Sequence, residues 1–135
     1  MNVLVDTSVW SLALRRAAAG SAAVSKELQE LVHEGRTVMI GPIRQELLSG
    51  VRTTSQFSLL REHLRAFPDQ PITTGDYEEA AIAFNRCRGR GIQGSNTDFL
   101  MCAVSLRLEV AIFTTDHDFE RFARVVPIQL HSVRS

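Results

Sequence analysis

The stretch Val3–Ser8, VLVDTS, decides the fold, because three apolar residues are followed at once by three helix-capping side chains. A short, uninterrupted apolar run is typical of a strand buried on both faces, as in a parallel sheet. Asp, Ser and Thr are preferred at the position just before a helix. The stretch therefore predicts a buried strand over residues 2–5 that leads directly into a helix containing Val9, Trp10 and Leu12.

The rest of the chain repeats this alternation of apolar strands and amphipathic helices. Strands are predicted over residues 38–41, 71–73, 110–114 and 125–130. The last of them is expected at a sheet edge because Pro127 lacks an N–H. Helices are predicted over residues 22–34, 43–49, 55–67, 76–88, 97–108 and 119–123, and loops over residues 15–21 and 89–94. Asp76 and Glu79 resemble a capping box that opens its helix.

Strands that alternate with helices along the chain indicate an α/β protein. No internal repeat or linker divides the sequence, so one domain is expected over residues 1–135. Helices on both faces of a central sheet predict a three-layer α/β/α fold with a mostly parallel sheet of four to five strands.

Composition gives weaker information about function. The formal net charge is zero, so bulk charge gives no sign of a nucleic-acid partner. Lys26 is the only lysine among 15 Lys and Arg residues. Arginine binds phosphate bidentately, so the preference for arginine over lysine would suit a nucleic-acid partner. Codon bias toward arginine explains the same preference equally well. No apolar stretch approaches the ~20 residues of a membrane span, and no secretory signal is visible. Cys87 and Cys102 fit neither a metal motif nor a disulfide framework, so a cytoplasmic protein is expected.

Four acidic residues stand where strands end or where helices begin. Asp6 ends the first strand, Asp116 follows the strand over residues 110–114, Asp98 begins a very apolar helix, and Glu46 lies half a helix beyond the second strand. Because the carboxyl ends of parallel strands line one edge of a sheet, we expect these carboxylates to meet there. Their mutual repulsion in a partly dry cleft favours a bound divalent cation.

Each acid alone also has a structural explanation. Asp6 and Asp98 could cap the helices that follow, Asp116 could belong to an acidic turn, and Glu46 could lie on a solvated helix face. Together they predict a magnesium or manganese site formed by Asp6, Asp98 and Asp116, in which a bound water is activated for attack on a phosphodiester. No serine–histidine or cysteine–histidine arrangement and no P-loop competes with this interpretation.

Polar residues beside these acids could support the site. Thr7, Ser8, Asn96 and Thr115 could hydrogen-bond the ligand carboxylates or a phosphate, the alternative being that they cap helices and turns. Asp118 could assist a second metal ion or could cap the following helix.

A basic cluster precedes the third acid. Arg86, Arg88 and Arg90 lead into the glycine-rich loop before Asp98. They could hold a nucleic-acid backbone beside the metal site. Alternatively, they form the solvated end of a helix, where positive charge suits the helix dipole.

Four segments of the chain resemble the motifs of PIN-domain proteins, in the order that this family has them. They are residues 3–10 (VLVDTSVW), 42–47 (PIRQEL), 96–103 (NTDFLMCA) and 113–119 (FTTDHDF). The resemblance spans nearly the whole chain, and the short length is most similar to the stand-alone VapC toxins of bacterial toxin–antitoxin pairs.

The resemblance implies a PIN-like fold and a Mg²⁺- or Mn²⁺-dependent endoribonuclease whose catalytic acids are Asp6, Glu46, Asp98 and Asp116. It also implies a homodimer and a cognate VapB-type antitoxin whose tail occupies the active-site groove. The exposed faces of the predicted helices over residues 22–34 and 55–67 are candidates for the dimer interface.

Three functions follow as hypotheses. The first is a toxin ribonuclease that cleaves a tRNA or rRNA loop, because a loop can be splayed into a cleft. The second is a structure-specific DNA nuclease, although the chain lacks long insertions that would clamp such a substrate. The third is a non-catalytic RNA-binding PIN-like domain, which would have no need for the complete set of acids.

Overall fold

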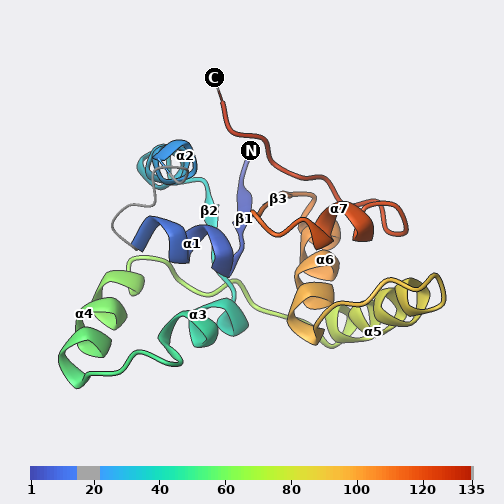
Figure 1. The fold of residues 1–135 in the computed structure, drawn as a ribbon, viewed down its shortest axis with the longest axis horizontal. Coiled ribbons are helices and arrows are strands. Elements are labelled where there is room, and N and C mark those ends of the chain that lie inside the picture. Colours follow the sequence, from blue (N-terminus) through green and yellow to red (C-terminus); the bar gives the residue numbers. More distant parts are fainter. Residues whose placement is uncertain (15–21, 135) are drawn as a thin grey trace.

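The computed structural model describes residues 1–14 and 22–134, and its centre is a small parallel sheet (Figure 1). The strands are β1 (Val3–Val5), β2 (Thr37–Val38) and β3 (Ala111–Phe113), in the order β2-β1-β3. β1 is completely buried in the middle, as expected for a continuous apolar run with neighbours on both sides. The predicted loop over residues 15–21 lies outside the described residues.

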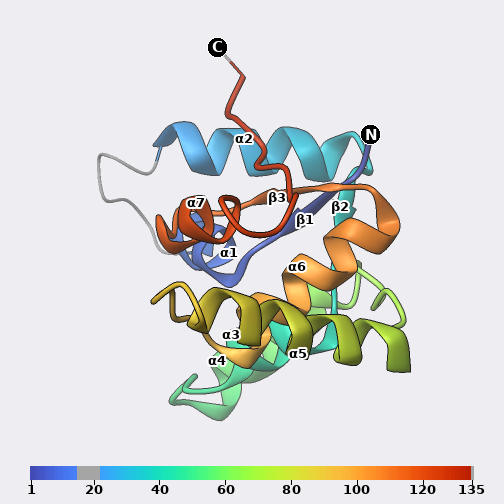
Figure 2. The same ribbon diagram turned by 90° about the vertical axis from the view of Figure 1, so that its right-hand side faces the viewer.

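Seven helices surround the sheet in the described part of the chain. They are α1 (Thr7–Leu14), α2 (Ala22–His33), α3 (Gly41–Leu48), α4 (Thr54–Leu64), α5 (Thr74–Arg88), α6 (Asn96–Leu108) and α7 (Asp118–Phe122). Figure 2 shows the sheet between α2 on one side and α5 on the other, which is the predicted layered α/β architecture. None of the helices within residues 1–14 and 22–134 is long and apolar enough to cross a membrane.

The sheet is smaller than predicted, with three strands among the described residues instead of four to five. The predicted strand over residues 125–130 is reduced to one bridge, in which Ile112 donates its N–H to the carbonyl of Gln129 at 2.9 Å. The next residue that could extend the pairing, Val110, instead donates its N–H to the carbonyl of Ser105 at 3.1 Å and accepts the Ser105 hydroxyl at 2.6 Å. The predicted strand over residues 71–73 is also absent, and the chain instead forms a single bridge between Met39 and Asp69.

The start of α5 also differs from the prediction. The capping box is formed by Thr73 and Asp76: the Thr73 hydroxyl accepts the N–H of Asp76, and the Asp76 carboxylate accepts the N–H of Thr73. Asp76 therefore stands three residues after the cap, and Glu79 takes no part. The same carboxylate binds Arg107 of α6 at 2.8 Å, which fixes α5 against α6.

The loop between α5 and α6 is held by a close approach of its backbone to the aromatic core. A Cβ atom at Gly94 would lie 2.5 Å from Cζ of Phe122 and 3.0 Å from Phe99. The rings of Phe99 and Phe122 pack at a centroid distance of 4.8 Å and are almost fully buried, so neither can move away easily.

We expect Gly94→Ala to lower the free energy of unfolding by about 1–3 kcal/mol, because the added methyl group overpacks this core. Gly41→Ala is the matched control, since a Cβ at Gly41 meets no atom within 4 Å. Urea unfolding of both variants measures the effect, and equal stabilities would contradict the packing argument.

A buried carboxylate attaches the C-terminal segment to α2. Glu27 is 2% exposed, and its oxygens lie 2.5 Å from Nε2 of His131 and 3.1 Å from Nε of Arg134. Burial by itself raises the pKa of Glu27. The hydrogen bonds from His131 and Arg134 together lower this pKa by more than burial raises it, so the pKa is below its ordinary value of 4.5.

We expect Glu27→Gln to lower the free energy of unfolding by about 1–3 kcal/mol at neutral pH, because the charged hydrogen bonds are lost. A lowered carboxyl pKa contributes stability that is complete above pH 4.5 and is lost as the pH falls through the folded-state pKa. The difference between wild type and variant should therefore shrink below pH 4.5 in urea unfolding series. A constant difference would contradict the assigned charge state.

Candidate active site

The carboxyl edge of the sheet opens into a cleft of about 600 Å³ that contains all four acids of the sequence pattern. The residues that line this acid cleft are Asp6, Thr7, Ser8, Gln45, Glu46, Ser49, Asp98 and Asp116. They come from the end of β1, from α1, α3 and α6, and from the segment after β3. The parallel sheet thus brings together residues that are up to 110 positions apart in sequence.

Asp6 occupies the buried floor of the acid cleft, with 7% of its surface exposed. Its N–H donates to the carbonyl of Phe113 at 2.9 Å and so extends the pairing between β1 and β3 by one residue. One carboxylate oxygen accepts the N–H of Thr7 at 2.8 Å. The other accepts the hydroxyls of Thr114 at 2.7 Å and Ser8 at 3.0 Å. The three hydrogen bonds to its oxygens fix the orientation of the carboxylate.

Asp98 is held at the start of α6 by a capping box. Its carboxylate accepts the N–H of Ser95 at 3.0 Å, and its own N–H donates to the Ser95 hydroxyl at 3.1 Å. The capping role that the sequence allowed is therefore real. Because only one carboxylate oxygen is used in this way, the same side chain can cap the helix and face the acid cleft.

Asp116 and Glu46 complete the rim of the acid cleft and are exposed. Asp116 accepts the N–H of Asp118 with one carboxylate oxygen at 2.9 Å, which begins α7. Glu46 accepts the hydroxyl of Thr7 at 2.7 Å, so α1 orients an acid that belongs to α3.

The electrostatics of the acid cleft reflect uncompensated negative charge. Burial is the largest cause that raises the pKa of Asp6, and the negative charge of Asp116 raises it too. Burial likewise raises the pKa of Asp98, and the charges of Asp6 and Asp116 add to that effect. No Lys, Arg or His is among the described residues that line the cleft. The site is therefore suited to a cation.

Only some of the supporting residues proposed from the sequence lie at the acid cleft. Thr7 and Ser8 line it, and their hydroxyls bind Glu46 and Asp6. Thr115 contributes only its backbone N–H, which donates to Ser8 at 3.1 Å.

Two other residues that the sequence suggested for the support of the site, Asn96 and Asp118, have different positions in the structure. Asn96 lines a separate groove between α5 and α6. Asp118 is the first residue of α7 and does not cap it, because the side chain that accepts a hydrogen bond there is that of Asp116.

Thr114 is a site residue that the sequence reasoning missed. Its hydroxyl donates to Asp6 at 2.7 Å and accepts the N–H of Asp116 at 3.0 Å, so it links two acids directly. The signal lies in the strand register: Val5 pairs with Phe113, which places Asp6 beside Thr114. That register cannot be read from either strand alone.

The basic cluster predicted to hold nucleic acid lies apart from the acid cleft. Arg86, Arg88 and Arg90 are exposed at the C-terminal end of α5 and just beyond it, and none of them lines the cleft. Arg88 stacks over the ring of Phe84 at 5.7 Å and donates to Asn85 at 3.1 Å.

The donor set of the acid cleft fits a hard divalent cation that keeps part of its water shell. All of its charged groups are carboxylates, and Mg²⁺ and Mn²⁺ accept such oxygen ligands. Among the described residues, no three His, Cys, Asp or Glu side chains are arranged closely enough to enclose an ion. Ligation partly through water, which is usual for Mg²⁺, agrees with this open arrangement.

Comparison with known proteins identifies the class to which this fold and site belong. The family model for the PIN domain matches residues 3–125. The chain is 31% identical over 137 aligned residues to the VapC ribonuclease Mb1587 of Mycobacterium bovis and to the ribonuclease VapC11 of Mycobacterium tuberculosis. Each alignment covers 98% of this chain and 99% of the relative.

Solved structures agree in fold. The chain superposes on FitAcB from Neisseria gonorrhoeae with a TM-score of 0.76 at 18% identity, covering 96% of both chains. It superposes on VapBC2 from Rickettsia felis, bound to a promoter DNA fragment, with a TM-score of 0.74 at 14% identity, covering 97% of this chain and 98% of that one. The chain therefore belongs to the PIN-domain family, and its full-length relatives are VapC ribonucleases.

Proposed function

We propose that this chain is a Mg²⁺- or Mn²⁺-dependent endoribonuclease and the toxin component of a type II toxin–antitoxin pair. The observation that carries the proposal is the convergence of Asp6, Glu46, Asp98 and Asp116 in one cleft without a neutralising cationic side chain among the described residues. The ribonuclease names of relatives that match the full length of the chain support it.

In this proposal Asp6, Asp98 and Asp116 hold the cation, directly or through water. The bound cation supplies charge neutralisation for the scissile phosphate and lowers the pKa of water. Glu46 lies at the rim, where its free carboxylate oxygen can orient the attacking water. Thr114 and Ser8 keep the Asp6 carboxylate in one orientation, so little reorganisation is needed on binding.

The substrate that we propose is a single-stranded loop of a tRNA or rRNA. The acid cleft is open enough to accept a strand whose backbone is splayed out of a duplex. Cleavage by attack of water would leave a 5′-phosphate and a 3′-hydroxyl.

We also propose a VapB-type antitoxin as a partner and a homodimer as the assembly. Two of the similar structures are VapBC2 from Rickettsia felis and FitAB, each bound to a DNA fragment. An antitoxin tail that enters the acid cleft would need basic or polar groups to satisfy the carboxylates. Purification of the chain with the product of its neighbouring gene tests this, and a chain that always elutes alone would count against it.

Side-by-side cleavage of RNA and DNA oligonucleotides of the same sequence, in Mg²⁺ or Mn²⁺, tests the proposed activity. We expect cleavage of the RNA and not of the DNA. Preferential cleavage of the DNA would support a DNA nuclease instead. Cleavage of neither, together with no calorimetric signal on adding Mn²⁺, would support a non-catalytic binding domain.

A further inference from the structure

The proposed reaction by itself does not distinguish RNA from DNA. Attack of water on the phosphodiester breaks the bond between phosphorus and the 3′ oxygen and makes no use of the 2′-hydroxyl, so a cation with its water would cleave either nucleic acid. The 2′-hydroxyl, which both donates and accepts hydrogen bonds, is the group by which a protein distinguishes the two. Selectivity for RNA therefore needs an unoccupied side chain near the cation that can bind a hydroxyl group.

Two side chains of the acid cleft meet this requirement among the described residues. Four of the eight residues that line the cleft are the acids, which the proposed reaction assigns to the cation and to the attacking water. The hydroxyls of Thr7 and Ser8 donate to two of these carboxylates, at 2.7 Å and 3.0 Å. The two that remain are Gln45 and Ser49, whose exposed side chains form no hydrogen bond within residues 1–14 and 22–134.

The spacing of Gln45 and Ser49 suits one hydroxyl group. They lie four positions apart at the end of α3, so their Cβ atoms are roughly 5–6 Å from each other on one side of the helix. A hydroxyl oxygen at about 2.8 Å from each of two partners bridges a similar width. Both side chains donate and accept, which matches a hydroxyl group, whereas a phosphate oxygen only accepts.

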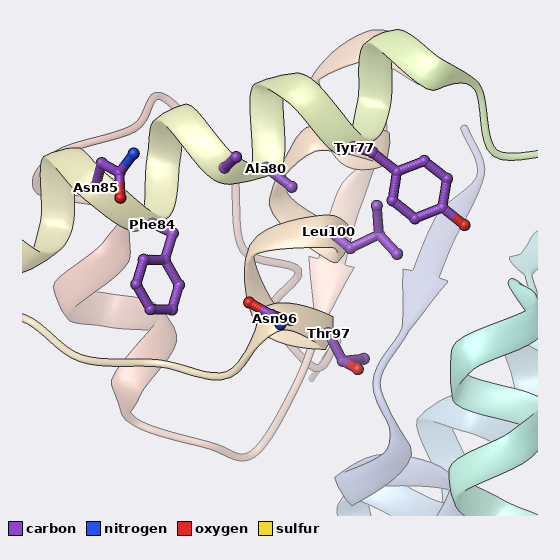
Figure 3. Close-up of a pocket in the computed structure, with 8 residues that line it drawn as sticks. Tyr77, Ala80, Phe84, Asn85, Asn96, Thr97 and Leu100 are labelled. Carbon is purple, nitrogen blue, oxygen red and sulfur yellow. The ribbon is translucent and has the colours of Figure 1, made fainter.

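Other polar groups near the acid cleft are directed elsewhere. Arg44, the only cationic residue of α3, donates to Asp69 at 2.9 Å and to the carbonyl of Leu64 at 3.0 Å. The amides of Asn85 and Asn96 line the separate groove between α5 and α6 (Figure 3). The wall of the cleft formed by α3 thus offers neutral hydrogen-bonding groups and no cation for a phosphate.

We propose that Gln45 and Ser49 bind the 2′-hydroxyl of a nucleotide beside the scissile phosphate and thereby select RNA over DNA. This rests on the proposed function and adds the residues that determine its substrate class. Because both side chains are exposed in an open cleft, water can replace a missing hydroxyl group. The expected discrimination at this nucleotide is therefore about tenfold, and not the roughly 10⁴-fold of a closed polar pocket.

An RNA oligonucleotide with a single 2′-deoxy nucleotide, moved in turn through the positions around the cleaved bond, tests the proposal. For the wild type we expect kcat/KM to fall about tenfold at one position. The Gln45→Ala/Ser49→Ala variant should cleave unmodified RNA about tenfold more slowly than the wild type. The 2′-deoxy nucleotide at that same position should then cause no further loss, because the groups that bind the hydroxyl are already absent.

Gln56→Ala on α4 is a matched control, since it removes an exposed helical glutamine that does not line the acid cleft. It should keep the wild-type rate and the wild-type loss at the sensitive position, and thermal unfolding checks that each variant is folded. A full tenfold loss from the 2′-deoxy nucleotide in the Gln45→Ala/Ser49→Ala variant would overturn the proposal, because another group would then bind the hydroxyl. A wild type that is insensitive at every position would overturn it as well.

Binding without cleavage separates this proposal from the proposed function. Fluorescence anisotropy of the same labelled oligonucleotides with the Asp98→Asn variant in Mn²⁺ measures recognition alone. We expect Kd to rise about tenfold with the 2′-deoxy nucleotide or with added Gln45→Ala/Ser49→Ala, and no further when the two are combined. If the wild type cleaves no RNA but binding has this pattern, the proposed catalysis fails and the recognition stands. An equal Kd for RNA and for every 2′-deoxy analogue would overturn the recognition, whatever the cleavage.

Discussion

Asp98→Asn should lower the rate of RNA cleavage by about 10²- to 10³-fold while leaving the fold intact. The carboxylate of Asp98 accepts the N–H of Ser95, and the side-chain oxygen of asparagine can accept it equally well. The helix cap is therefore kept, whereas one negative charge of the acid cleft is removed. Cleavage of a fixed RNA by purified protein in Mg²⁺ or Mn²⁺ measures the effect, and thermal unfolding reports whether the variant is folded.

Glu62→Gln is a suitable control for Asp98→Asn, because it removes an exposed carboxylate far outside the acid cleft. Its cleavage rate should equal that of the wild type. A folded Asp98→Asn variant that cleaves at the wild-type rate would exclude Asp98 from the reaction.

Thr114→Val should lower cleavage by about 10- to 100-fold, although Thr114 is not expected to touch the substrate. Its hydroxyl donates to Asp6 and accepts the N–H of Asp116, and valine keeps the shape but loses both hydrogen bonds. The Asp6 carboxylate would then be held only by the Thr7 N–H and the Ser8 hydroxyl, and its orientation in the buried position would be less well fixed. Because Asp6 is proposed to hold the cation, the concentration of Mn²⁺ that gives half-maximal cleavage should rise.

Rescue by Thr114→Ser separates positioning from packing. Serine restores the hydroxyl without the methyl group, so it should recover most of the Mn²⁺ dependence of the wild type. If valine and serine variants have the same Mn²⁺ dependence as the wild type, Thr114 does not position the metal ligands.

The acid cleft could be predicted from the sequence because the acidic residues can be recognised from their position at the end of a strand or the start of a helix. Asp6 and Asp116 follow apolar strands directly, and parallel pairing then brings strand ends to one edge of the sheet. Thr114 could not be found in the same way, since its contact with Asp6 depends on the register between two strands 108 residues apart.

The errors at the edges of the fold also have physical causes. Residues 125–130 have the apolar composition of a strand, but only one bridge forms, because Val110, the next residue with which they would pair, is already hydrogen-bonded to Ser105. Asn96 is close to Asp98 in sequence, but α6 turns its side chain into the groove beside α5. Neither outcome depends on composition, so neither could be predicted without the packing of neighbouring elements.

A titration of Mn²⁺ against the rate of RNA cleavage tests most directly whether the acid cleft binds the divalent cation that cleavage requires. We predict no cleavage in excess chelator, a saturable increase of the rate with Mn²⁺ for the wild type, and no increase for Asp6→Asn. Cleavage that persists in chelator, or an Asp6→Asn variant with the wild-type titration curve, would contradict the claim.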